Sequence, residues 1–240
     1  MIIGINGKIG SGKDTIGEII RGLCLTNKDQ VFEIKKFAGK LKQIGSILSG
    51  IPVEKFEDQE FKQKHMGLEW EMTYREFLQK LGTEAMRDGL HTNVWVNALF
   101  ADYRLWSDGS KDWYPNWIIT DMRFPNEMEA IVEKGGLTIR VVRNNNAKYS
   151  DKKVKSILKD MGYVDLSDGV WEELAINEGF TWFETFKLWT WDEDDNNNEA
   201  LHPSETALDD AEFDYEIIND GSIEDLVTKV REILTKENII

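Results

Sequence analysis

The sequence contains a single cysteine, Cys24, among its 240 residues. One thiol cannot form a disulfide within the chain, and such sparing use of cysteine is typical of a reducing compartment. No apolar run approaches the ~20 residues that a membrane-spanning helix needs. Residues 1–5 also lack the positively charged start and the cleavage site of a signal peptide. We therefore expect a soluble protein of the cytoplasm that does not enter a membrane.

Positive charge is scarce as well. The chain has 29 Lys and Arg against 44 Asp and Glu, a net charge of −15 with histidine neutral. Duplex nucleic acid and anionic membranes are bound through a basic face, so we expect this acidic chain to bind neither. A phosphorylated small molecule remains compatible, because a few local cations can hold it. The sequence shows no internal repeat, and its 41% of hydrophobic residues suffice for one sizeable core.

A glycine-rich segment follows the first apolar run. Residues 1–6 are rich in isoleucine, which predicts a buried parallel strand. The segment GKIGSGKDT comes next, and apolar residues then recur at helical spacing to about residue 25. Strand, glycine loop, lysine and helix form the context of a phosphate-binding P-loop, whose backbone N–H groups point at phosphate oxygens. The predicted phosphate-binding residues are Gly10, Ser11, Gly12, Lys13, Asp14 and Thr15.

The residue after Lys13 departs from the usual pattern of such loops. That position commonly carries a Ser or Thr whose hydroxyl ligates Mg²⁺, whereas this chain has Asp14 followed by Thr15. Either Asp14 binds the metal or its water shell, or Thr15 contributes from a shifted position. The simpler alternative is a glycine turn that only caps a helix, with Asp14 favoured by the helix dipole. The flanking strand and helix favour phosphate binding.

Strands and helices alternate along most of the remaining sequence. Further strands are predicted over residues 31–37, 117–120, 137–142 and 215–218. Helices are predicted over residues 38–48, 73–88, 92–106, 125–135 and 223–234, while residues 52–70 have no clear periodicity. This alternation predicts an α/β fold, with a P-loop kinase-like parallel sheet flanked by helices.

Polar residues follow three of the predicted strands. They are the glycine loop, Asp121 with Arg123, and Arg143. Ligands of parallel sheets collect at the carboxyl ends of the strands. We therefore expect these three groups to converge on one edge of the sheet.

Residues 144–201 interrupt the alternation. They hold four of the nine tryptophans, Trp171, Trp182, Trp189 and Trp191. So many aromatic residues predict a packed subdomain rather than a linker. We expect a core of residues 1–143 and 202–240 with an inserted lid-like subdomain at 144–201, although a surface for a partner or for oligomerisation is the alternative.

Several short motifs occur together in one order. They are GKDT at 12–15, FAGKLK at 37–42, LQKLGT at 78–83, WV at 95–96, DMR at 121–123 with Glu127, VVR at 141–143, His202 with Glu205, and NDGS at 219–222. With these motifs the chain resembles the deoxynucleoside monophosphate kinases of bacteriophages, a branch of the P-loop nucleotide kinases. The resemblance implies transfer of the γ-phosphoryl group of ATP to a deoxynucleoside monophosphate, with Mg²⁺. For a phage-encoded protein it implies the host cytoplasm.

The same resemblance implies roles for individual residues. It assigns the phosphates of ATP to the residues of the glycine loop. It assigns the acceptor nucleotide to Leu41, Lys42, Arg75, Gly82, Thr83, Trp95, Asp121, Arg123 and Glu127. The residues expected to be catalytic are Lys13, Arg123 and Arg143. Phosphoryl transfer brings two anions together, so a protein that catalyses it mainly positions them and neutralises charge.

Two other functions fit the same residues. One is a P-loop kinase for another small molecule, such as a phosphorylated metabolite, and the other is a regulatory nucleotide-binding module without transfer activity. A pure ATP-binding module has no need of an acceptor site, so Arg123 and Arg143 favour an enzyme. The expected partners are small-molecule nucleotides, and a homodimer is left open.

Overall fold

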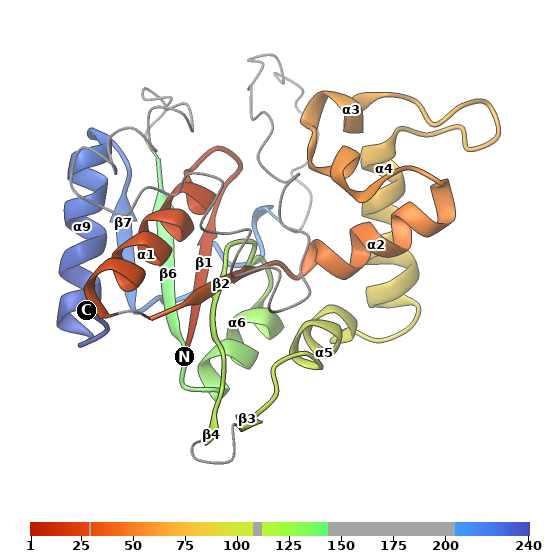
Figure 1. The fold of residues 1–240 in the computed structure, drawn as a ribbon. Helices are drawn as coiled ribbons and strands as arrows, with labels where there is room; N and C mark the ends of the chain where they lie inside the picture. Colours follow the sequence, from red (N-terminus) through yellow and green to blue (C-terminus); the bar gives the residue numbers. More distant parts are fainter. Residues whose placement is uncertain (29, 108–111, 144–204) are drawn as a thin grey trace. The chain divides into compact units, whose positions relative to one another are not determined.

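A computed structural model describes residues 1–28, 30–107, 112–143 and 205–240 (Figure 1). The expected insertion at 144–201 and His202 lie outside the described residues. Within the described ranges, no helix combines the length and the apolar character that crossing a membrane requires.

The described residues form two compact units. The first contains Met1–Phe37, residues 96–143 and residues 205–240, and the second is Ala38–Trp95. In the helix α5 (Val94–Phe100), Val94 and Trp95 belong to the second unit and the residues from Val96 onward belong to the first. The part of the chain expected as one core therefore holds a second, separately packed segment.

The first unit is built on a sheet of five strands in the order β2-β5-β1-β6-β7. These are β1 (Ile2–Gly7), β2 (Phe32–Lys35), β5 (Asn116–Ile119), β6 (Leu137–Val142) and β7 (Tyr215–Ile218). All four pairings between neighbours are parallel. The prediction of a parallel sheet is confirmed, and because parallel strands run the same way, all five carboxyl ends meet at one edge.

Strand β1 lies at the centre because both of its faces are apolar. Ile3 and Ile5 are fully buried in the main core, which they share with α1 (Lys13–Lys28) and α9 (Ile223–Lys236). Gly4 points to the other face, where a Cβ would come within 2.6 Å of Ile131 Cδ1.

Ile131 belongs to α6 (Pro125–Glu133), so helices cover both faces of the sheet (Figure 1). The flanking helices predicted from the sequence are confirmed. Ser222 caps the start of α9: its hydroxyl accepts the N–H of Asp225, whose carboxylate accepts the N–H of Ser222.

The second unit consists of short helices. They are α2 (Ala38–Ser49), the 3₁₀ turn η1 (Val53–Glu57), α3 (Gln59–Gln63), α4 (Tyr74–Gln79) and the π-helical segment η2 (Lys80–Asp88). Phe56, Phe77 and Leu78 form its core. Thr73 and Glu76 cap the start of α4 reciprocally, since the Thr73 hydroxyl accepts the Glu76 N–H and the Glu76 carboxylate accepts the Thr73 N–H.

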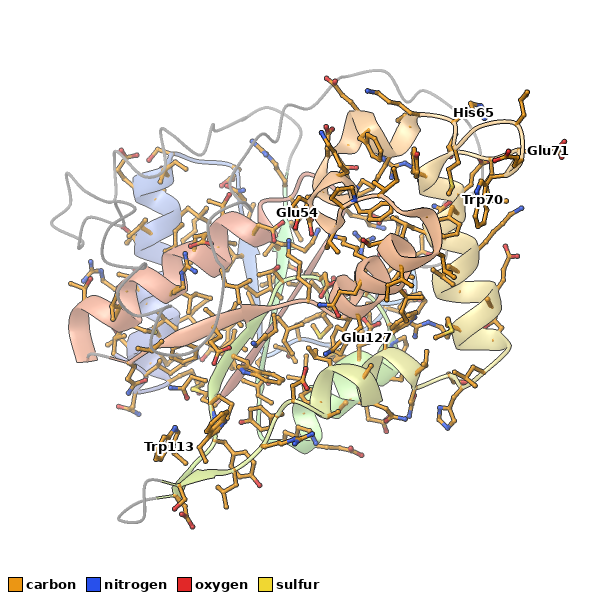
Figure 2. All side chains as sticks on the ribbon, turned by 45° about the vertical axis from the view of Figure 1, so that its right-hand side comes forward. Glu54, His65, Trp70, Glu71, Trp113 and Glu127 are labelled. Carbon is orange, nitrogen blue, oxygen red and sulfur yellow. The ribbon has the colours of Figure 1, made fainter. Side chains whose placement is uncertain are left out.

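Two of the predicted helices differ from the structure. The helix predicted over 73–88 is not one α-helix, because it changes to π-type hydrogen bonding at Lys80. The helix predicted over 92–106 was too long: α5 ends at Phe100, and β3 (Trp106–Ser107) then pairs antiparallel with β4 (Asp112–Trp113). Figure 2 shows Trp113 on this hairpin.

The physical reason for the early end of α5 is aromatic packing. The ring of Tyr103 stacks on Tyr114 at 5.1 Å between centroids and meets the ring of Trp117 edge-on at 4.8 Å. These contacts join residues before and after the hairpin. The apolar spacing of residues 92–106 therefore came from packing on distant aromatic rings and not from one continuous helix.

Candidate functional site

The glycine loop lies between β1 and α1, at the carboxyl edge of the sheet. Gly10 has a φ of 76° and Gly12 a φ of 99°, conformations that only glycine adopts without strain. A Cβ on Gly12 would also come within 2.6 Å of Asn219 Nδ2. The Ser11 hydroxyl is buried and has no hydrogen-bond partner within the described structure. The loop thus has the narrow backbone path and the unused polar group expected of a phosphate cradle.

Asn219, which directly follows β7, hydrogen-bonds to this loop. Its side-chain Nδ2 donates to the backbone oxygen of Ser11 at 2.9 Å, and its backbone N–H donates to Val142 O at 2.7 Å. The residue is 3% exposed. Asn219 therefore fixes the loop to the neighbouring strands of the sheet.

The Lys13 side chain is buried and turned toward its own loop. Nζ donates to Gly7 O at 2.6 Å and to Lys8 O at 2.8 Å. Burial, with the positive charge of Arg123, lowers the pKa of Lys13 to about 8, although nearby carboxylates act in the opposite direction. A phosphate in place of these two carbonyl oxygens would stabilise the charged form of the Lys13 amine more strongly, because phosphate oxygens are negatively charged.

Asp14 is held by two neighbours that sequence reasoning missed. Its Oδ1 accepts the Thr120 hydroxyl at 2.7 Å and lies 3.1 Å from Lys36 Nζ. Burial raises the pKa of Asp14, but Lys36, Thr120 and Lys13 together outweigh it and leave this pKa below its ordinary value. Thr120 directly follows β5 and Lys36 directly follows β2. Because ligand-binding residues of parallel sheets gather at the carboxyl ends of strands, these positions could have been predicted from the sequence.

The segment after β5 is held by two carboxylates. Asp121 Oδ1 accepts the Phe37 N–H at 2.8 Å. Glu127, which is 2% exposed, accepts the N–H of Arg123 at 2.8 Å and that of Phe124 at 3.1 Å. Figure 2 shows Glu127 on α6. These bonds shape the loop around Arg123, a role that the resemblance did not give to Glu127.

Arg123 and Arg143 both lie at the edge that carries the glycine loop. Arg143 Nη1 donates to Gly10 O at 2.9 Å. The guanidinium of Arg123 pairs with Glu205, whose other carboxylate oxygen accepts the N–H of Ile9 in the glycine loop. The prediction that three polar groups converge on one edge is confirmed. The sequence places Glu205 in a motif with His202, but spacing does not predict its contact with Arg123.

The remaining expected site residues belong to the second unit. Lys42 pairs with Glu57 at 2.6 Å, and Arg75 Nη2 donates to Gln59 Oε1 at 2.9 Å. The indole of Trp95 donates to Gly82 O at 2.9 Å. Leu41 and Trp95 both approach Gly82 closely, which gives them a packing role in their own unit, and Thr83 directly follows Gly82 in η2.

The side chain of Leu41 lies close to position 82. A Cβ on Gly82 would come within 2.9 Å of Leu41 Cδ2. Cδ2 is the far end of the leucine side chain, so a small shift of Leu41 would make room for a Cβ, and this contact by itself does not require glycine.

Within the described residues, no group of three or more His, Cys, Asp and Glu side chains gathers to hold a metal ion. Mg²⁺ binds oxygen ligands, keeps several waters and is often held by one or two carboxylates together with substrate phosphates. Asp14, next to Lys13 in the glycine loop, supplies one carboxylate of this kind, whose Oδ1 here accepts the Thr120 hydroxyl and pairs with Lys36. The structure therefore fits a cation that arrives with a nucleotide.

The sheet order and the glycine loop define the class of the protein. A central parallel strand that leads through a glycine loop into a helix, with a buried lysine at its first turn, is the arrangement of P-loop kinases. The chain is an α/β protein of this class.

Sequence comparison gives the family. The profile of the family described as "Deoxynucleotide monophosphate kinase" matches residues 23–157, more than half of the chain. A protein of Acanthamoeba polyphaga mimivirus with the provisional name of a deoxynucleotide monophosphate kinase is 31% identical over 154 residues, which are 60% of this chain and 74% of that protein. The chain belongs to the deoxynucleotide monophosphate kinase family, and family and loop together support a nucleotide-binding phosphotransferase.

Two solved structures of shikimate kinases resemble this chain, with a lower sequence identity than the viral relative. The enzyme from Aquifex aeolicus is 12% identical with a TM-score of 0.38, covering 99% of this chain and 98% of its own. The enzyme from Bacteroides thetaiotaomicron is 14% identical with a TM-score of 0.32, covering 98% of both chains. The fold class rests on the sheet order and the glycine loop instead.

Proposed function

We propose that the protein is a deoxynucleoside monophosphate kinase that transfers the γ-phosphoryl group of ATP to the 5′-phosphate of its acceptor, giving ADP and a deoxynucleoside diphosphate. One observation carries the proposal: three cations, the buried Lys13 and the partly buried Arg123 and Arg143, lie at one edge of the sheet in a chain with a net charge of −15. Membership of the kinase family supports it.

The roles we propose follow from the charges and donors. Lys13 and the backbone of the glycine loop bind the phosphates of ATP, and Arg143 stabilises charge beside Gly10. Arg123 grips the acceptor phosphate, whose oxygen attacks the γ-phosphorus while the bond to the ADP oxygen breaks. Bound Mg²⁺ would neutralise charge on the donor phosphates. The acceptor phosphate is ionised at neutral pH, so no strong general base is required.

We also propose that residues of the second unit contact the acceptor nucleotide. Lys42 and Arg75 are the cations suited to this role, and each is now bonded to a neighbour in its own unit, Glu57 or Gln59. Trp95 is buried against Gly82, so its contribution is to hold the η2 segment in place.

A coupled assay of ADP release tests the proposal. The protein is given ATP and Mg²⁺ with each deoxynucleoside monophosphate, each ribonucleoside monophosphate and a set of unrelated phosphorylated metabolites. We expect turnover with deoxynucleoside monophosphates. Turnover only with another metabolite would identify a different small-molecule kinase, and ATP binding without turnover on any acceptor would identify a regulatory module.

The lowered pKa of Lys13 predicts proton uptake on ATP binding. With a pKa of about 8 in the free protein, the amine is mostly charged at pH 7 and mostly neutral at pH 9. Phosphate oxygens stabilise the charged form, so binding raises this pKa, and Lys13 should take up about 0.9 proton at pH 9 but only about 0.1 at pH 7. ATP affinity should accordingly fall as the pH rises above about 8.

Titration calorimetry in buffers of different ionisation enthalpy measures this uptake. The Lys13→Met variant is the control, because it retains the nucleotide's own titration and removes that of the amine. An uptake at pH 9 that is equal in the wild type and in Lys13→Met would show that the amine does not meet the phosphates.

A further inference from the structure

Glu205 contacts the glycine loop and Arg123 at the same time, within the first unit. Its Oε2 accepts the N–H of Ile9 at 3.3 Å, and its Oε1 pairs with Arg123 Nη1. The backbone oxygen of Glu205 accepts Lys8 Nζ at 2.9 Å. Its side chain is 11% exposed and that of Arg123 is 31% exposed. The carboxylate therefore lies on the protected side of the guanidinium.

Arg123 is consequently fixed at both of its ends. Glu127 holds its backbone N–H, and Glu205 holds one nitrogen of its guanidinium. A guanidinium has five N–H donors in a planar fork, so a bond through Nη1 does not use its capacity for a phosphate. The bond does set the plane and the position in which those other donors are presented.

Charge gives a second argument for the same residue. Arg123 and Lys13 are like charges close enough for Arg123 to lower the pKa of Lys13, whereas Glu205 raises it. A carboxylate beside both cations offsets their repulsion in the absence of nucleotide. It thereby allows two cations to stay close at the place where two phosphates would meet.

We propose that Glu205 is a positioning residue for phosphoryl transfer: it holds the Arg123 guanidinium at a fixed place relative to the glycine loop. This inference rests on the proposed function of Arg123 as the residue that grips the acceptor phosphate. Misplacement of a reacting group by about 1 Å can cost about 10²-fold in rate, so loss of this bond should affect turnover more than ATP binding.

The test compares two variants of Glu205 with a matched control. Glu205→Gln keeps the size and an acceptor oxygen but removes the charge, and we expect kcat to fall by about 10- to 100-fold with ATP affinity within about twofold of wild type. Glu205→Asp keeps the charge on a shorter side chain and should recover part of the loss. The control is Asp209→Asn, a substitution that removes one negative charge, as Glu205→Gln does. Asp209 also forms an ion pair, with Lys8 at 2.8 Å. It should leave kcat within about twofold.

A double-mutant cycle with Arg123→Ala separates positioning from folding. If Glu205 acts through Arg123, then Glu205→Gln should cause little further loss in the Arg123→Ala background. An undiminished loss in that background, or an unchanged kcat in Glu205→Gln alone, would overturn the inference while wild-type turnover still supports the proposed function. Absence of wild-type turnover with every deoxynucleoside monophosphate would overturn both.

Discussion

Replacement of Lys13 by alanine is expected to reduce phosphoryl transfer by about 10²–10³-fold, equivalent to about 3–4 kcal/mol of transition-state stabilisation. Lys13 is the buried cation of the glycine loop, and its two hydrogen bonds are to carbonyl oxygens of that loop. Nucleotide phosphates would replace these neutral acceptors with charged ones, and the interaction gains strength as charge develops during transfer. The measurement is steady-state turnover at saturating ATP and acceptor.

The matched control for this variant is Lys229→Ala. Lys229 is an exposed lysine on α9 of the same unit, and it pairs with Asp220 at 3.1 Å. This change should leave turnover within about twofold, since exposed ion pairs contribute little. Near-normal turnover of Lys13→Ala would contradict the assignment of the glycine loop to ATP.

The second large effect is expected at Arg123. Arg123→Ala should lower kcat/KM for the monophosphate by about 10²-fold or more, while ATP binding measured by titration stays within about twofold. Arg123→Lys should recover only part of this loss, because a single ammonium cannot replace the planar fork that grips a phosphate through two bonds. The two measurements separate an acceptor site from a donor site.

Arg104 offers a control of the same residue type. It is exposed and donates from Nε to the backbone oxygen of Ala101 at 2.8 Å, so Arg104→Ala should leave both constants near those of the wild type. If Arg123→Ala weakens ATP binding as much as it weakens the acceptor, Arg123 contacts the donor nucleotide instead.

The sheet and the convergence of the polar groups could be predicted from the sequence, because both depend on local signals. Residues 2–7 and 137–142 are short apolar runs between polar turns, and such runs form buried parallel strands. Once the strands are parallel, the residues that follow them must meet at one edge. Arg143 next to Gly10 is the direct consequence.

The rest depended on contacts between distant residues. The ion pair of Arg123 with Glu205 joins positions 82 residues apart, and no periodicity encodes such a pair. The hairpin of β3 and β4 could not be predicted from the sequence, because the aromatic residues that pack around it also fit a helical spacing. Within 73–88, the apolar residues Phe77 and Leu78 are buried, whereas Ala85 is exposed. The change to π-helical bonding at Lys80 has no sequence signal that we can name.

The bond between Asn219 and Ser11 has a consequence for how the protein acquires its activity during synthesis. The two residues are 208 positions apart, so the glycine loop emerges from the ribosome long before the asparagine that supports it. The main core has the same property, because Ile3 and Ile5 pack with Val227 and Val230 of α9. Contacts of such long sequence separation form late, after the entropy of closing the chain has been overcome. A nascent chain that lacks both Asn219 and α9 should therefore be unable to retain ATP, and nucleotide binding should appear only when the segment that contains them has been made.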